Sequence, residues 1–93
     1  MIIQKGDRVS DLTNVANSVV SGVINVSTSE TSLPEHDCIG VIIQNTGTNT
    51  VVVNESIKLS SGAMLNIPVS KSSLIRVKTE TLTSQIAYLI LAI

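Results

Sequence analysis

The sequence has almost no aromatic residues: it contains no Trp, no Phe and a single Tyr, Tyr88. Aromatic side chains bury about 150–250 Å² each and often dominate the core of a small domain. In this chain of 93 residues the core must instead come from 12 Val, 12 Ile and 8 Leu. A short chain with such a core is marginally stable on its own, so we expect partner subunits to complete it.

Cysteine is equally scarce. Cys38 is the only one, which excludes an intramolecular disulfide framework. A free thiol is compatible with a reducing compartment or with a particle assembled in one. The sequence shows no cluster of side chains that suggests a structural metal. Of the usual means of stabilising a small domain, oligomerisation remains.

Charge is also low, at 14% of residues with a net charge of −1. The chain therefore has no basic patch for nucleic acid. No apolar run approaches 18 residues, which argues against a helical membrane span. The first twenty residues lack the basic, apolar and small-residue order of a signal peptide. With 43% hydrophobic residues, the chain is too apolar to be disordered.

β-Branched residues are abundant, since Val, Ile and Thr make up 33 of the 93 positions. They fall in short runs separated by polar turns, and residues 27–36 form a polar loop. This spacing predicts an all-β fold, either a small antiparallel β-sandwich or a jelly-roll-like barrel of six to eight short strands, over residues 19–93. We expect strands at 19–26, 38–44, 50–54, 56–59, 64–67, 73–78 and 85–93.

Turn residues suggest how these strands pair. Gly47 lies in a polar turn after 38–44, where we expect it to adopt a positive φ and return 50–54 as the partner strand. In the same way we expect 64–67 to pair with 56–59. Gly40, inside a strand, indicates a β-bulge or the close approach of another backbone.

The first 18 residues form an N-terminal arm or one short helix. From Val9 to Val23, apolar residues recur at helical a/d spacing, with Asp7 placed to cap the start and Gly22 the end. Many intervening residues are Ser, Thr or Asn, which are poor helix formers. Helix and strand therefore both remain open for residues 7–20.

The last eight residues are all apolar, so a C-terminal strand has two apolar faces. Such a strand is either buried centrally in its own domain or packs one face on the core and the other on another subunit. We expect the second face to contribute to subunit contacts. The predicted interface residues are Leu89, Leu91 and Ile93, together with Ile2 and Ile3.

One segment, residues 35–38, gathers the side chains that could carry chemistry. His36 and Cys38 could form an activated thiolate pair. However, they lie two positions apart on one short segment, whereas a nucleophile and its base come from separate elements. The segment also has too few ligands to enclose a metal, unless three copies of His36 met on an oligomer axis. We expect no catalytic, metal or cofactor site, and no enzymatic activity.

Two stretches have a recognisable order of elements. Residues 39–54 read as an apolar strand, an Asn-x-Gly turn and a Val-rich strand ending in Asn, and 57–67 continue with a Leu-x-x-Gly turn. Over residues 38–93 this resembles small β-sandwich virion proteins of bacteriophages, such as capsid decoration proteins and the capsid-bound parts of head fibres. The resemblance implies a structural role in the virion, often as trimers, in contact with other virion proteins such as the major capsid protein. It carries over no site residue.

We therefore predict a non-enzymatic subunit of a phage particle that homo-oligomerises, with a trimer favoured, through apolar β surfaces. The alternative is a β-sandwich module that binds a host-surface ligand or glycan through the polar loops Thr28–Ser32 or Thr46–Thr50. Only Tyr88 offers an aromatic ring for stacking on a sugar, which counts against the alternative.

Overall fold

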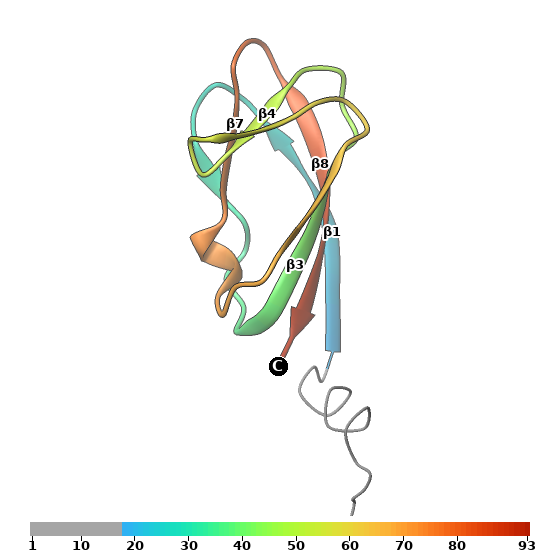
Figure 1. Cartoon of the computed structure of the whole chain (residues 1–93), viewed down its shortest axis with the longest axis vertical. Helices are drawn as coiled ribbons and strands as arrows, with labels where there is room; N and C mark the ends of the chain where they lie inside the picture. Colours follow the sequence, from blue (N-terminus) through green and yellow to red (C-terminus); the bar gives the residue numbers. More distant parts are fainter. Residues whose placement is uncertain (1–17) are drawn as a thin grey trace, which may run out of the picture.

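The structure, a computed structural model, describes residues 18–93 of the chain (Figure 1). The predictions made for residues 1–17, including the arm or short helix and the interface residues Ile2 and Ile3, lie outside this range. Within residues 18–93, eight strands form two four-stranded antiparallel sheets, and one 3-10 turn, η1, is the sole helical element. The all-β sandwich prediction is confirmed, and the two sheets do not close into a barrel.

The strands follow one another along the chain as β1 (Ser18–Val26), β2 (Thr31–Ser32), β3 (Cys38–Asn45), β4 (Val51–Val53), β5 (Ile57–Leu59), β6 (Met64–Ile67), β7 (Arg76–Thr79) and β8 (Ser84–Ala92), with η1 (Ser72–Leu74) before β7. The first sheet has the order β1-β8-β3-β6 and the second β2-β7-β4-β5. Figure 1 shows β1, β8 and β3 in one layer and β4 with β7 in the other.

The pairing order reveals the topology. β1 pairs with β8, β2 with β7, β3 with β6 and β4 with β5, each antiparallel. The chain is thus one long hairpin whose first half lies against its second half, rolled into two sheets. This arrangement is a jelly roll.

Two predicted pairings are wrong. β4 does not return on β3, since it lies in the second sheet between β7 and β5; β6 pairs with β3 and not with β5. The connection after Asn45 crosses between the sheets, and the Asn45 side chain bonds the carbonyls of Asn49 and Leu59. All three residues of β4 are buried, which fits an internal strand with a neighbour on each side.

The expected positive φ at Gly47 is also wrong, because among the glycines of residues 18–93 only Gly62 has one, at 83°. Gly47 is required for a different reason. A Cβ atom there would lie 2.6 Å from the backbone nitrogen of Gln85, at the start of β8. The turn after β3 therefore packs directly on the backbone of another strand. Gly40 behaves as predicted: the β3–β8 register shifts between Cys38 and Gly40.

Residues 18–26 form a strand, β1, so the helix considered for residues 7–20 is wrong from position 18 onward. Its nine residues pair without interruption with β8, from Ser18 opposite Ala92 to Val26 opposite Ser84. Gly22 does not end a helix but lies in mid-strand opposite Tyr88, where a Cβ atom would come within 2.7 Å of the tyrosine Cζ. The glycine makes room for the only aromatic ring in the chain.

A single copy encloses its own aliphatic core between the sheets. Ile43, Ile86 and Ile90 of the first sheet and Val77 of the second are fully buried. On the face of β8 opposite the predicted interface residues, Ile86, Ile90 and Ala92 are buried in this core, whereas Tyr88 is half-buried at its margin. The side chains that point between the sheets are thus enclosed within one copy, and a partner subunit would contact the outward faces of the sheets.

Candidate assembly surface

The outer face of the β1-β8-β3-β6 sheet follows from strand alternation. Since Ile86 and Ile90 point into the core, Ala87, Leu89 and Leu91 point outward from β8. The register places Leu89 opposite Ser21 of β1 on one side and Ile42 of β3 on the other. The same alternation assigns the outward positions of every strand in the sheet.

Seven of these 13 outward residues are apolar, and none carries a charge. We call them the outer face: Val19, Ser21, Val23, Asn25, Gly40, Ile42, Gln44, Met64, Asn66, Gln85, Ala87, Leu89 and Leu91. Val19, Val23 and Met64 expose 58%, 57% and 63% of their surface, and Ile42, Leu89 and Leu91 are half-buried. Apolar side chains thus run from one edge of the sheet to the other.

A shallow hollow of about 320 Å³ lies on the outer face, over β3, β6 and β8. Ile42, Met64, Ala87 and Leu89 line it, and Gln44 is the main polar side chain in it. The hollow is open and wide, so it has the form of a contact surface rather than of an enclosed ligand cavity.

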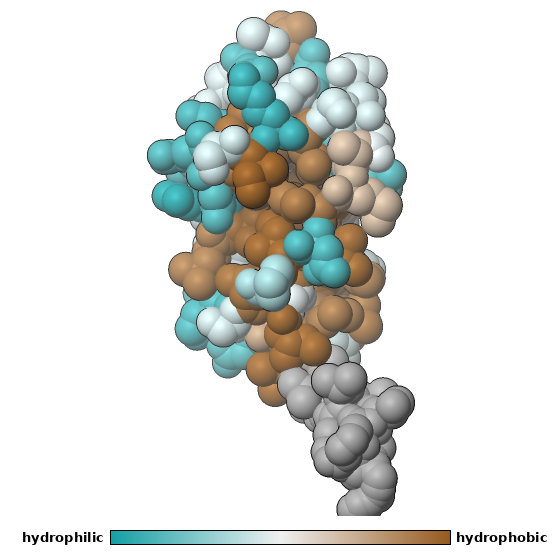
Figure 2. All heavy atoms as spheres, in the orientation of Figure 1, coloured by the Kyte–Doolittle hydropathy of each residue, from teal (hydrophilic) through white to brown (hydrophobic). Residues whose placement is uncertain are grey.

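The outer face of the second sheet has the opposite character. Arg76 and Lys78 point outward from β7, and Lys58 points outward from β5. Val52 of β4 lies between the two lysines and is only 6% exposed, because the lysine stems cover it. Lys58 pairs with Glu80 at 2.7 Å, a hydrogen bond that raises the pKa of Lys58. Figure 2 shows hydrophilic atoms gathered on the side of β4 and β7, while hydrophobic atoms run down the middle of this view.

The structure brings two of the predicted interface residues, Leu89 and Leu91, onto the outer face. Ile93 follows the end of β8 and is 59% exposed; its backbone nitrogen donates to the Asp37 carbonyl oxygen at 3.0 Å. Sequence reasoning missed Val19, Val23, Ile42 and Met64. The helical reading of Val19 and Val23 hid their alternation with the inward residues of β1, and the faces of Ile42 and Met64 become evident only from the β3–β6 register.

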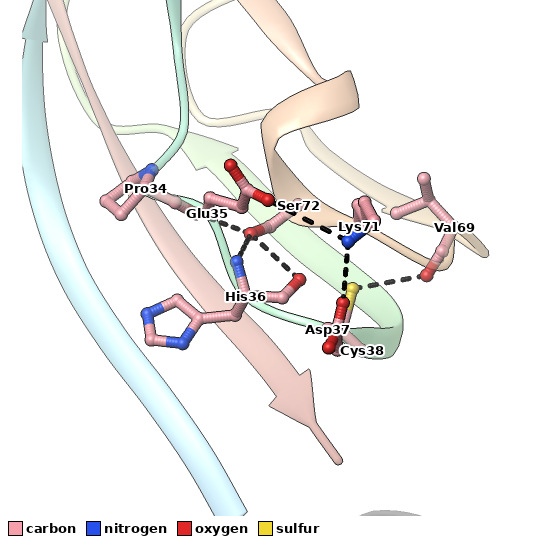
Figure 3. Close-up of polar contacts among 8 residues, drawn as sticks. All are labelled: Pro34, Glu35, His36, Asp37, Cys38, Val69, Lys71 and Ser72. Atoms are coloured by element: carbon pink, nitrogen blue, oxygen red, sulfur yellow. Dashed lines mark hydrogen bonds and ion pairs between the residues drawn. The ribbon is translucent and has the colours of Figure 1, made fainter.

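Residues 34–38 include the side chains considered above for catalysis. They are held against residues 69–72 by a set of polar contacts that we call the clamp (Figure 3). The Ser72 hydroxyl donates to the Pro34 carbonyl oxygen and accepts from the His36 backbone nitrogen at 2.8 Å. The buried Cys38 thiol donates to the Val69 carbonyl oxygen at 3.2 Å. Figure 3 shows the His36 ring pointing away from the Cys38 sulfur, so the two do not form a nucleophile–base pair.

An ion pair closes the same clamp. Lys71 Nζ lies 2.9 Å from Asp37 Oδ1 and 3.8 Å from Glu35 Oε2. The hydrogen bond to Asp37 raises the pKa of Lys71 above the usual lysine value. A raised pKa keeps the lysine protonated in the folded state, so the stability that Lys71 contributes through this contact is present at neutral pH and is lost as the pH rises through the folded pKa of the lysine.

No group of three or more His, Cys, Asp or Glu side chains within residues 18–93 is placed to hold a metal ion. Nor does this part of the chain contain a helix with the length and hydrophobicity to cross a membrane. A scan of the sequence against protein-family models and against curated proteins finds no match.

Proposed function

We propose that this protein is a non-enzymatic structural subunit of a phage particle, and that it assembles with copies of itself and docks on other virion proteins through the outer face. One observation carries the assembly part of the proposal. Of the two outward sheet faces, one bears the charges usual for a solvated surface, and the other bears none while exposing Val19, Val23 and Met64.

The size of the outer face suits an interaction surface. At about 4.8 Å between strands and 3.3 Å per residue, four strands of these lengths outline roughly 500 Å², and apolar side chains occupy about half of the outward positions. The largest apolar patches on monomeric proteins measure about 300–600 Å² and are often functional. Water around such a face is released when a second apolar surface covers it, at about 25 cal/mol for each Å² buried.

The virion part of the proposal is supported by the resemblance of residues 38–93 to phage decoration and head-fibre proteins. Jelly rolls also occur in viral capsid proteins, but lectins and cupins share the topology, so the topology alone does not assign the function. The trimer that the resemblance implies stays a prediction, as does contact with the major capsid protein.

The alternative, glycan or host-surface binding through polar loops, has less support. Side chains of the 46–50 loop are engaged within the molecule: Asn49 Nδ2 donates to the Thr83 carbonyl oxygen at 2.6 Å and Thr46 Oγ1 to that of Gln85 at 3.1 Å. Tyr88 lies at the core margin, opposite Gly22, where its ring is not presented by either loop.

Assembly through the outer face is tested by Leu89→Asp, measured by light scattering over a dilution series. A charge at the centre of the face must be desolvated on association, so we expect at least a tenfold weaker association and a lower native mass. Ile93→Asp tests the predicted C-terminal contact in the same way. Leu74→Asp is the control, because Leu74 is 55% exposed in η1, away from the outer face. Equal masses for wild type and Leu89→Asp would contradict the proposal.

The virion role needs a separate experiment. Mass spectrometry of gradient-purified particles of the phage that encodes the chain should detect it in the copy number of a structural protein. Particles without the chain would contradict this part of the proposal and leave the assembly surface untouched.

A further inference from the structure

The four sheet edges of the sandwich differ in how well they are protected from pairing with another strand. In the second sheet, the edge strands are β2, with two residues, and β5, with three residues including Lys58. In the first sheet, β6 has four residues and is followed by Pro68. Short strands, lysine and proline are the devices by which proteins keep edges unpaired.

β1, the remaining edge, has none of these devices. It runs for nine residues, Ser18–Val26, with the sequence Ser-Val-Val-Ser-Gly-Val-Ile-Asn-Val, which contains no charge and no proline. Its register against β8 is unbroken, so no bulge twists it away. Within residues 18–93 it pairs on one side only, and every second residue directs its backbone N–H and C=O away from β8.

We propose that β1 pairs antiparallel with β1 of a second copy about a two-fold axis, joining the two β1-β8-β3-β6 sheets into one eight-stranded sheet. This deepens the proposed function, on which it rests for the identity of the partner, by naming the contact that joins two subunits first.

Three features favour a second copy of this chain as the occupant. An uncharged strand can lie beside an identical strand without opposing like charges. A two-fold contact is closed, so it uses both β1 edges and leaves only the short β6 edges at the ends of the joined sheet. Residues 18–93 also offer no other edge of matching length, since β6 covers fewer than half as many residues as β1.

The joined sheet also changes the size of the outer face. Val19 and Val23, more than half exposed at the rim of one copy, come to lie near the middle of the pair. The two outer faces become one surface of roughly 1,000 Å² in outline. That exceeds the roughly 800 Å² per partner of a standard stable interface, so the pair presents a larger docking surface than either copy alone.

Edge pairing and face docking are separated by measuring association of the full chain in the Leu89→Asp background, where docking through the outer face is suppressed. We expect a two-chain species to persist in this background. A monomer would overturn edge pairing while supporting the face proposal. A three-chain species would also overturn it, since a two-fold contact does not produce a trimer.

A matched pair of variants in the same background locates the contact. Val23→Lys and Met64→Lys each place a charge on a well-exposed apolar residue of the same face, one on the β1 edge and one on the β6 edge. We expect Val23→Lys to weaken pairing at least tenfold and Met64→Lys to change it less than twofold. Equal effects, or a larger effect of Met64→Lys, would overturn the proposal.

Disulfide cross-linking tests the register without relying on a disruptive charge. Single cysteines are introduced at Val19, Ser21, Val23 and Asn25, and the variants are mixed in pairs under mild oxidation; Cys38 stays in place because it is buried. In antiparallel pairing about a two-fold axis, residue i of one copy lies opposite residue j of the other only when i + j has one fixed value. The fastest cross-links should therefore form between positions whose residue numbers add up to the same value. Cross-links without that constant sum, or none at all, would contradict β1–β1 pairing.

Discussion

Asn45 is the most highly bonded side chain of the interior. It is fully buried, and its Nδ2 donates to the carbonyl oxygens of Asn49 and Leu59, both at 2.8 Å. Its Oδ1 accepts from the Gly47 backbone nitrogen at 3.1 Å and from the Ser84 hydroxyl at 2.8 Å. One amide thus satisfies both donors and both acceptor positions while tying three segments together.

Asn45→Asp replaces the two N–H donors by an oxygen that faces two carbonyl oxygens. Burial and these carbonyls raise the pKa of the introduced carboxyl in the folded state. Because the unfolded chain loses this proton near pH 3.9 and the folded chain holds it, the unfolding free energy falls as the pH rises above about 4. Urea unfolding should show a loss of about 3 kcal/mol or more at pH 7 and a smaller loss at pH 4.

Asn66→Asp provides the control for this pH dependence, since Asn66 is exposed on β6 and the same chemical change is solvated there. Because Asn66 belongs to the outer face, the proteins are compared at a concentration low enough to keep them monomeric, and there we expect the unfolding free energy of Asn66→Asp to follow that of wild type at both pH values. A loss for Asn45→Asp that does not grow with pH would show that the amide donors are not what the site requires.

The backbone of Leu82 is strained. It has a φ of 59°, a left-handed conformation that costs a side chain of this kind about 1 kcal/mol, and it is 74% exposed. Leu82→Asn should therefore raise the unfolding free energy by about 0.5–1 kcal/mol, measured by urea denaturation. Leu74→Asn, at an exposed leucine with no positive φ, should bring no gain. A destabilised Leu82→Asn variant would contradict this account.

At the scale of elements, two glycines mark where strands approach closely, and they should respond differently to the same change. At Gly47 a Cβ atom would meet backbone atoms of Ser84 and Gln85, whereas at Gly22 it would meet the end of the Tyr88 ring, which can turn. Gly47→Ala should cost more than about 2 kcal/mol of unfolding free energy, and Gly22→Ala distinctly less. Thermal and urea unfolding of the two variants compare them; the reverse order would contradict the packing described for the turn after β3.

The longer strands could be predicted from sequence because their apolar runs are unambiguous. The predicted strands 38–44 and 85–93 correspond to β3 and β8 within one residue at each end. The ends of a strand were not predicted where contacts with residues elsewhere in the chain decide at which residue the strand begins. The predicted strand 73–78 begins only at Arg76, because the Ser72 hydroxyl ties η1 to Pro34 and His36, and β2 is too short to stand out in a polar loop.

For the whole molecule, composition and turn spacing were sufficient to predict a sandwich but not its topology. Which strands pair depends on connections that cross between the sheets, as six of the seven connections do. The connection after β3 is held by Asn45, whose role as a buried hub has no local signal. The candidate surface was predictable in part from the two-faced apolar strand that carries Leu89 and Leu91. The expectation of an incomplete core rested on the missing aromatics, but isoleucines such as Ile43 and Ile86 fill the space between the sheets.

Because Ser18 lies directly opposite Ala92, the β-sandwich starts and finishes at the same pole (Figure 1). A tag or cargo domain fused to Ile93 would project from the pole at which β1 begins, while the turns at the far pole stay clear. Linking Ala92 to Ser18 with a few flexible residues and opening the chain at the exposed 60–62 turn would rearrange the order of the strands in the gene without altering a single pairing in space.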